Sequence, residues 1–187
     1  EAMLTEISPQ VGALVQMSLA NAGKDKDPNF DLKKQLIGNL GNDLITYQKA
    51  PRSAKLADLS SPPTLFLLAS PNADQVLNSL KVAVSMINPV PLKEREFLGR
   101  KIHSLTVPPM PGPDGQPVER SFSFTASGGY VAMSADAGFL EEYLRSAGNQ
   151  GKPLADVPGL KDAAQRVGGL GTGWFGYEHQ GEVARVV

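Results

Sequence analysis

The feature that most constrains the fold is the alternation of apolar and polar side chains within residues 101–133. Lys101–Val107 and Glu119–Ser127 alternate with a period of two residues, which is the period of a β-strand. Ser127-Gly128-Gly129 then leads directly into Tyr130–Met133, and glycine tolerates the positive φ angles of a tight hairpin turn. The pattern predicts three antiparallel strands in a meander.

Two amphipathic helices are predicted from a second pattern, in which an apolar strand runs into a serine. The strands that start at Thr64 and Gly129 end at Ser70 and Ser134, and serine is a favourable N-cap residue. The apolar residues that follow have helical spacing, at Val76, Leu77, Leu80, Val84 and Ile87 and at Phe139, Leu140, Tyr143, Leu144 and Ala147. We therefore expect an α+β fold, with an antiparallel meander sheet covered on one face by amphipathic helices.

Weaker patterns extend this prediction to both sides of the segment. On the N-terminal side they indicate a helix around Pro9–Ala22, a short helix opened by Pro28, and a strand at Leu44–Gln48. A linker with three prolines follows at 50–63. On the C-terminal side a further helix precedes a last strand at Gly173–His179. The order agrees with α+β architecture.

An internal repeat is predicted from the alignment of residues 28–50 with residues 158–180, at an offset of 130 residues. Random pairing would give about one or two identities, by ordinary residue frequencies. The six identical pairs are Pro28/Pro158, Gln35/Gln165, Gly38/Gly168, Leu40/Leu170, Gly41/Gly171 and Tyr47/Tyr177. We expect residues 1–57 to be a partial repeat unit, residues 58–187 to be a full unit, and both to pack as one globular body.

Composition excludes several classes of protein. With 187 residues the chain is long enough to bury its own core. Its 18 basic and 19 acidic residues give a net charge of −1, which disfavours nucleic acid as a partner. The absence of cysteine excludes disulfides, thiolate metal sites and cysteine nucleophiles. The longest apolar run, Leu65–Ala69, is far shorter than the roughly 20 residues of a membrane span.

Candidate catalytic groups are few. His103 and His179 are the two histidines, and Glu178 and Glu182 lie close to His179 in the sequence. Their spacing matches no metal motif, so we expect no metal and no cofactor. A hydrolase with a site assembled between the repeat units, around His103 and Glu178–Glu182, is the alternative to a protein without catalytic activity.

The glycine-rich run at 168–173 does not predict a phosphate site. A Rossmann turn needs a strand before it and a helix after it, whereas here a predicted helix comes first and a strand follows. A helix C-cap explains the run instead. No Gly-x-Ser-x-Gly sequence occurs, and we predict no catalytic residue.

Two segments are candidates for binding a protein partner. Residues 108–118 hold five prolines and two glycines, which predicts an exposed loop that does not pair in a sheet. Within it Pro108, Pro109, Met110 and Pro111 have the spacing of a polyproline recognition segment. Trp174 and Phe175 are neighbours on a predicted strand and must point to opposite faces, so one of them can contact a partner or the remainder of a larger chain.

The segments SGGYVAMSAD, FLEEYLRS and PLADVPGLKDAAQRVGG make residues 64–180 similar to uncharacterised bacterial cell-envelope proteins of unknown function. The resemblance implies an exported protein, periplasmic or extracellular, with two related halves, and it supplies no catalytic residues. We therefore expect a non-catalytic binding or structural module of the bacterial cell envelope. The C-terminal GEVARVV ends within an alternating apolar stretch, which favours a piece of a longer chain.

Overall fold

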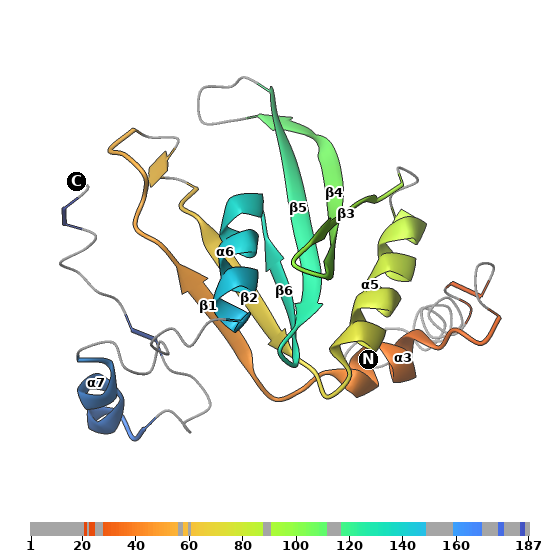
Figure 1. Cartoon of the computed structure of the whole chain (residues 1–187), viewed down its shortest axis with the longest axis horizontal. Coiled ribbons are helices and arrows are strands. Elements are labelled where there is room, and N and C mark those ends of the chain that lie inside the picture. The colour runs from red at the N-terminus through yellow and green to blue at the C-terminus, as the bar shows by residue number, and fades with distance from the viewer. Residues whose placement is uncertain are drawn as a thin grey trace, which may run out of the picture.

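One antiparallel sheet of six strands, in the order β1-β2-β6-β5-β4-β3, forms the centre of the molecule (Figure 1). The computed structural model describes residues 21, 23–24, 28–55, 58–59, 61–87, 91–111, 117–148, 159–169, 176–177 and 184–185. The strands are β1 (Leu44–Gln48), β2 (Thr64–Ala69), β3 (Lys93–Phe97), β4 (Arg100–Pro111), β5 (Pro117–Ser127) and β6 (Tyr130–Ser134). The helices are α3 (Leu32–Gln35), the 3-10 helix η1 (Ile37–Asn39), α5 (Ala73–Ile87), α6 (Ala137–Gly148) and α7 (Leu160–Arg166). The predicted α+β class and antiparallel sheet are confirmed.

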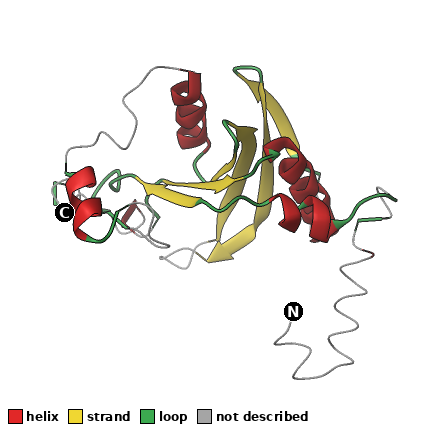
Figure 2. Cartoon of the chain, turned by 90° about the horizontal axis from the view of Figure 1, so that it is seen from below, coloured by secondary structure: helices red, strands yellow, loops and turns green. Residues whose placement is uncertain are grey.

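The two long helices lie on opposite faces of the sheet (Figure 2). Val131 of β6 packs with Val76 of α5, whereas the next residue, Ala132, packs with Leu140 of α6. Successive residues of a strand point to opposite faces, so the expectation that helices cover a single face is wrong. The physical reason is visible in β6 itself, since Val131 and Ala132 are both fully buried, as in a strand that is covered on both faces.

The core consists of two apolar layers, one under each helix. The α6 layer holds Leu65, Ile102, Ala132, Phe139, Leu140 and Leu144. The α5 layer holds Val76, Leu77, Phe124, Ala126 and Val131. Each helix contributes the apolar face that its 3.6-residue periodicity predicts, and burial of these side chains is the main force that holds the helices on the sheet.

The turns that lead into α5 and α6 have the same hydrogen bonds. Ser70 Oγ accepts from the N–H of Asn72 at 3.0 Å, and Asn72 Oδ1 accepts from the N–H of Gln75 at 3.3 Å. Ser134 Oγ accepts from the N–H of Asp136 at 3.0 Å, and Asp136 Oδ1 accepts from the N–H of Phe139 at 3.1 Å. The helix N-caps are therefore Asn72 and Asp136, while the serines predicted as caps stabilise the preceding turn.

The predicted repeat of about 130 residues is not shown by the structure. Phe30 precedes its helix α3, whereas its counterpart Leu160 is the first residue of α7. Tyr47 lies in β1, whereas Tyr177 lies outside any strand. Only residues 176–177 of the predicted strand at Gly173–His179 are described, and they do not form one. The helix predicted at Pro9–Ala22 falls outside the described residues except for Asn21, which is helical.

The proline-rich connection differs from the prediction. β4 continues to Pro111, and Met110 pairs with Val118 after a register shift between Val107 and Met110. The expectation that this segment cannot pair in a sheet is therefore wrong at both of its ends. A β-bulge interrupts the hydrogen-bond ladder at the two consecutive prolines, because proline has no N–H to donate.

Strand β3 is absent from the sequence prediction because its residues, KEREF, are nearly all charged and show no apolar alternation. A two-residue turn at Leu98 and Gly99, with φ angles of 51° and 72°, joins it to β4. Two consecutive positive φ angles are those of a type I′ hairpin turn.

Candidate functional site

Three large apolar side chains are exposed on the α5 face of the sheet, outside the area that α5 covers. Leu44 is 65% exposed, Phe66 39% and Phe122 43%. Phe66 lies opposite Met133, which in turn lies opposite Phe124 of the α5 layer, so these side chains share one face. We call Leu44, Phe66 and Phe122 the open sheet surface. Large apolar side chains exposed on one face of a sheet are typical of surfaces that bind proteins.

The predicted partner-binding residues are only partly located. Pro108, Pro109, Met110 and Pro111 form the end of β4, which continues with β5 beyond the neighbouring strands (Figure 1). They are strand residues and not a free loop. Trp174 and Phe175 lie outside the described residues. Sequence reasoning missed the open sheet surface, although the alternation at Phe122 and Phe124 was the available signal.

His103 of β4 is buried against the α5 layer beside a carboxylate. Its side chain is 3% exposed, and its ring centroid lies 5.7 Å from that of Phe124. Glu94, directly opposite on β3, places Oε2 3.3 Å from His103 Nδ1, although the atoms are not aligned for a hydrogen bond. The other oxygen of Glu94 lies 2.7 Å from Lys101 Nζ, and Lys81 Nζ of α5 is 3.8 Å from Oε2.

Burial and charge set the protonation of this cluster. Burial, assisted by Lys81, lowers the pKa of His103 below its ordinary value of 6.5, while the Glu94 charge opposes this shift. The hydrogen bond from Lys101 lowers the pKa of Glu94. At neutral pH the site therefore holds a neutral imidazole beside an ionised carboxylate. Such a pair can accept a proton, but a side chain that is 97% covered cannot touch a substrate in this arrangement.

The alternative site around His103 and Glu178–Glu182 is not assembled by the described residues, because Glu178, His179 and Glu182 lie outside them. Within the described ranges no group of three or more His, Cys, Asp or Glu side chains is placed to hold a metal ion. The carboxylate beside His103 is instead Glu94, which sequence reasoning missed because only the β3–β4 register brings the two together.

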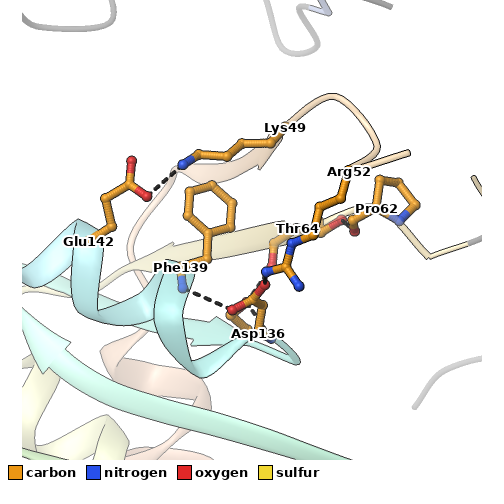
Figure 3. A network of polar contacts seen from close by, with 8 residues as sticks. Lys49, Arg52, Pro62, Thr64, Asp136, Phe139 and Glu142 are labelled. Atoms are coloured by element: carbon orange, nitrogen blue, oxygen red, sulfur yellow. Dashed lines mark hydrogen bonds and ion pairs between the residues drawn. The ribbon is translucent and has the colours of Figure 1, made fainter. Parts of the chain in front are cut away.

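A network of polar contacts fastens β1 and the segment after it to α6 (Figure 3). Lys49 Nζ lies 2.5 Å from Glu142 Oε2 and 4.7 Å from the ring centroid of Phe139. Arg52 pairs with Asp136, whose other carboxylate oxygen caps α6 at Phe139. The network joins the edge of the sheet to the helix N-terminus, where a carboxylate is favourable.

The described helices include none that is long and apolar enough to cross a membrane. Comparison of the chain with protein-family models, curated proteins and solved structures gives no match.

Proposed function

We propose that the chain is a non-catalytic protein-binding module of the bacterial cell envelope. The observation that carries the proposal is the open sheet surface, where Leu44, Phe66 and Phe122 expose apolar area beside a well-covered core. Transfer of such area out of water contributes about 25 cal/mol per Å². The partner that suits it is a protein segment with an apolar face of its own.

The burial of the His103 side chain supports a binding role over catalysis. General acid–base catalysis needs a group within hydrogen-bond reach of the substrate, and the imidazole of His103 is covered. The location in the cell envelope rests on the resemblance of residues 64–180 to exported proteins. Fractionation of cells that express the full-length native protein tests this location, and recovery in the cytoplasm would contradict it.

The binding proposal is tested by a photo-crosslinking residue at position 66 in the native host. The partner captured there is then titrated against the purified Phe122→Ser variant. We expect its affinity to fall at least about tenfold, since loss of a buried aromatic anchor costs over about 1.4 kcal/mol. Val167→Ser is the matched control, because Val167 is 61% exposed on the turn after α7. Equal affinity of both variants would overturn the proposal, provided that thermal unfolding shows both to be folded.

A hydrolase is the second candidate, favoured by the carboxylate 3.3 Å from His103 Nδ1. It predicts that His103→Gln abolishes a hydrolytic activity of the purified chain, and that His179→Ala lowers its metal content if the site holds a metal. Unchanged metal content and unchanged turnover in these variants would eliminate this candidate.

A further inference from the structure

Strand β1, at one edge of the sheet, carries no charged residue. It is the terminal strand of the sheet, its sequence is LITYQ, and all five residues are exposed. No strand of the described chain pairs with its outer side. An exposed edge of this kind presents unpaired N–H and C=O groups and is a template for another strand.

The hydrogen bonds to β2 show which backbone groups point outward. The carbonyl of Asp43 accepts from Ala69 N at 2.9 Å, and the N–H of Lys49 donates to Pro63 O at 3.0 Å. In an antiparallel ladder alternate residues face the same neighbour, so residues 43, 45, 47 and 49 face β2. Leu44, Thr46 and Gln48 therefore present their N–H and C=O groups to the open edge.

We propose that two copies of this chain associate through β1, as antiparallel strands centred on Thr46. This inference goes beyond the protein-binding function proposed above and does not depend on it. In this register Thr46 lies opposite Thr46 of the second copy, and the outward-facing groups of Leu44 meet those of Gln48. All the outward N–H and C=O groups of Leu44, Thr46 and Gln48 then find partners, which is the most that any register of β1 with itself allows.

Side-chain complementarity selects the same register. Ile45 lies opposite Tyr47 of the second copy, and pairs of β-branched and aromatic residues stabilise antiparallel sheets. Asp43 lies opposite Lys49, so the strand is flanked by two ion pairs related by symmetry. A shift by two residues in either direction removes both ion pairs. Lys49 also contacts Glu142 and keeps 36% of its side chain exposed.

A second copy is the occupant because the strand is complementary to itself. A two-fold axis through such a pair is perpendicular to the sheet and makes the interface isologous. Both copies then turn the same face to the same side, and the two open sheet surfaces lie side by side along one extended sheet.

Single cysteines test the register directly, because the chain contains none. In the proposed pair the two Thr46 Cα atoms are about 5.5 Å apart, within the range of a disulfide. The two Gln48 Cα atoms are about 14 Å apart along the strands, which is too far. We expect Thr46→Cys to form disulfide-linked dimers with oxidised glutathione and Gln48→Cys to remain monomeric. Equal cross-linking of the two variants, or cross-linking of Gln48→Cys alone, would overturn the register.

Sedimentation of the 187-residue chain tests the association itself. At about 0.1 mM protein we expect the wild type to contain dimers. Thr46→Pro removes an outward N–H at an edge position that tolerates proline, so this variant stays folded and monomeric. Thr46→Val keeps the N–H and is the matched control, which still dimerises. A monomeric wild type, or a dimeric Thr46→Pro variant, would contradict the inference. Binding of the photo-captured partner by Thr46→Pro is measured separately, so failure of one proposal is distinguishable from failure of the other.

Discussion

The two edges of the sheet are built from opposite kinds of residue. β1 has the uncharged sequence LITYQ, whereas β3 has the sequence KEREF, in which four of five residues are charged. Charged residues on an edge strand prevent pairing with other strands, because pairing would desolvate them. Charge therefore protects the β3 edge, whereas the sequence of β1 carries no such protection.

The two edges are also attached differently to the body of the molecule. β3 packs the partly buried Phe97 against the α6 layer, and the 2.7 Å ion pair between Arg95 and Glu141 and the cation–π contact of Arg145 over Phe97 at 4.9 Å add to this. β1 instead places Tyr47 5.5 Å from the buried ring of Phe139. Exposed ion pairs, which occur at both edges, contribute about 0 to 1 kcal/mol each, so the aromatic contacts carry most of the attachment, and the ring that β1 contacts is the more deeply buried one.

The largest effect on stability is expected at Phe139, the aromatic residue that Tyr47 of β1 contacts. Phe139→Ala should lower the free energy of unfolding by about 3–5 kcal/mol, because it empties part of the α6 layer. Phe97→Ala at the other edge should cost about 1–2 kcal/mol, because Phe97 is only partly buried. Urea denaturation measures both values. Equal costs would show that the two edges are attached alike.

A smaller effect is expected at the N-terminus of α6. Asp136→Ala removes the helix cap and the ion pair with Arg52, so it should cost about 1–2 kcal/mol. Asn72→Ala removes the matching cap of α5, which has no such ion pair in the described residues, and should cost about 1 kcal/mol.

Asp136→Asn separates the cap from the ion pair. Asparagine still caps the helix, so this variant should lose less than about 1 kcal/mol. Thermal unfolding ranks the three variants. A loss in Asp136→Asn as large as in Asp136→Ala would mean that the charge of Asp136, and not the cap, stabilises this end of α6.

The sequence predicts those elements whose periodicity is strong. The bounds of β1 and the presence of β2, α5, β5, β6 and α6 follow from apolar spacing and from the serine-containing turns. β3 could not be found this way, because an exposed edge strand needs no apolar side. The face that each helix covers was also mispredicted, although Tyr130–Met133 has no polar position and is therefore typical of a strand buried on both faces.

The candidate site is less accessible to sequence reasoning than the fold. His103 and Glu94 are nine positions apart and meet only because the turn at Leu98 and Gly99 fixes the register of β3 and β4. The exposure of Phe66 and Phe122 depends on how much of the sheet α5 covers. That coverage is set by tertiary packing and not by the local sequence. The uncharged character of β1 could be read directly, but its position at the sheet edge could not.

A dependence of stability on pH is expected at the β3 edge, where His103 lies beside Glu94, and has no counterpart at β1. Burial lowers the pKa of His103 below 6.5 in the folded state, so the unfolded chain binds more protons as the pH falls. The stability that His103 contributes is present above pH 6.5 and is lost as the pH falls toward the folded pKa. One proton gives a slope of at most about 1.4 kcal/mol per pH unit.

Glutamine does not titrate, so the stability of His103→Gln should fall less than that of the wild type as the pH drops below 6.5. His179 is present in both proteins, and its contribution cancels in the difference. Glu94 titrates in a lower window, because Lys101 holds its pKa below the ordinary value of 4.5. Urea denaturation at several pH values measures the difference. Parallel curves for the two proteins would mean that His103 is protonated as easily in the folded chain as in the unfolded one. The buried imidazole beside β3 would then contribute nothing to the pH dependence of stability.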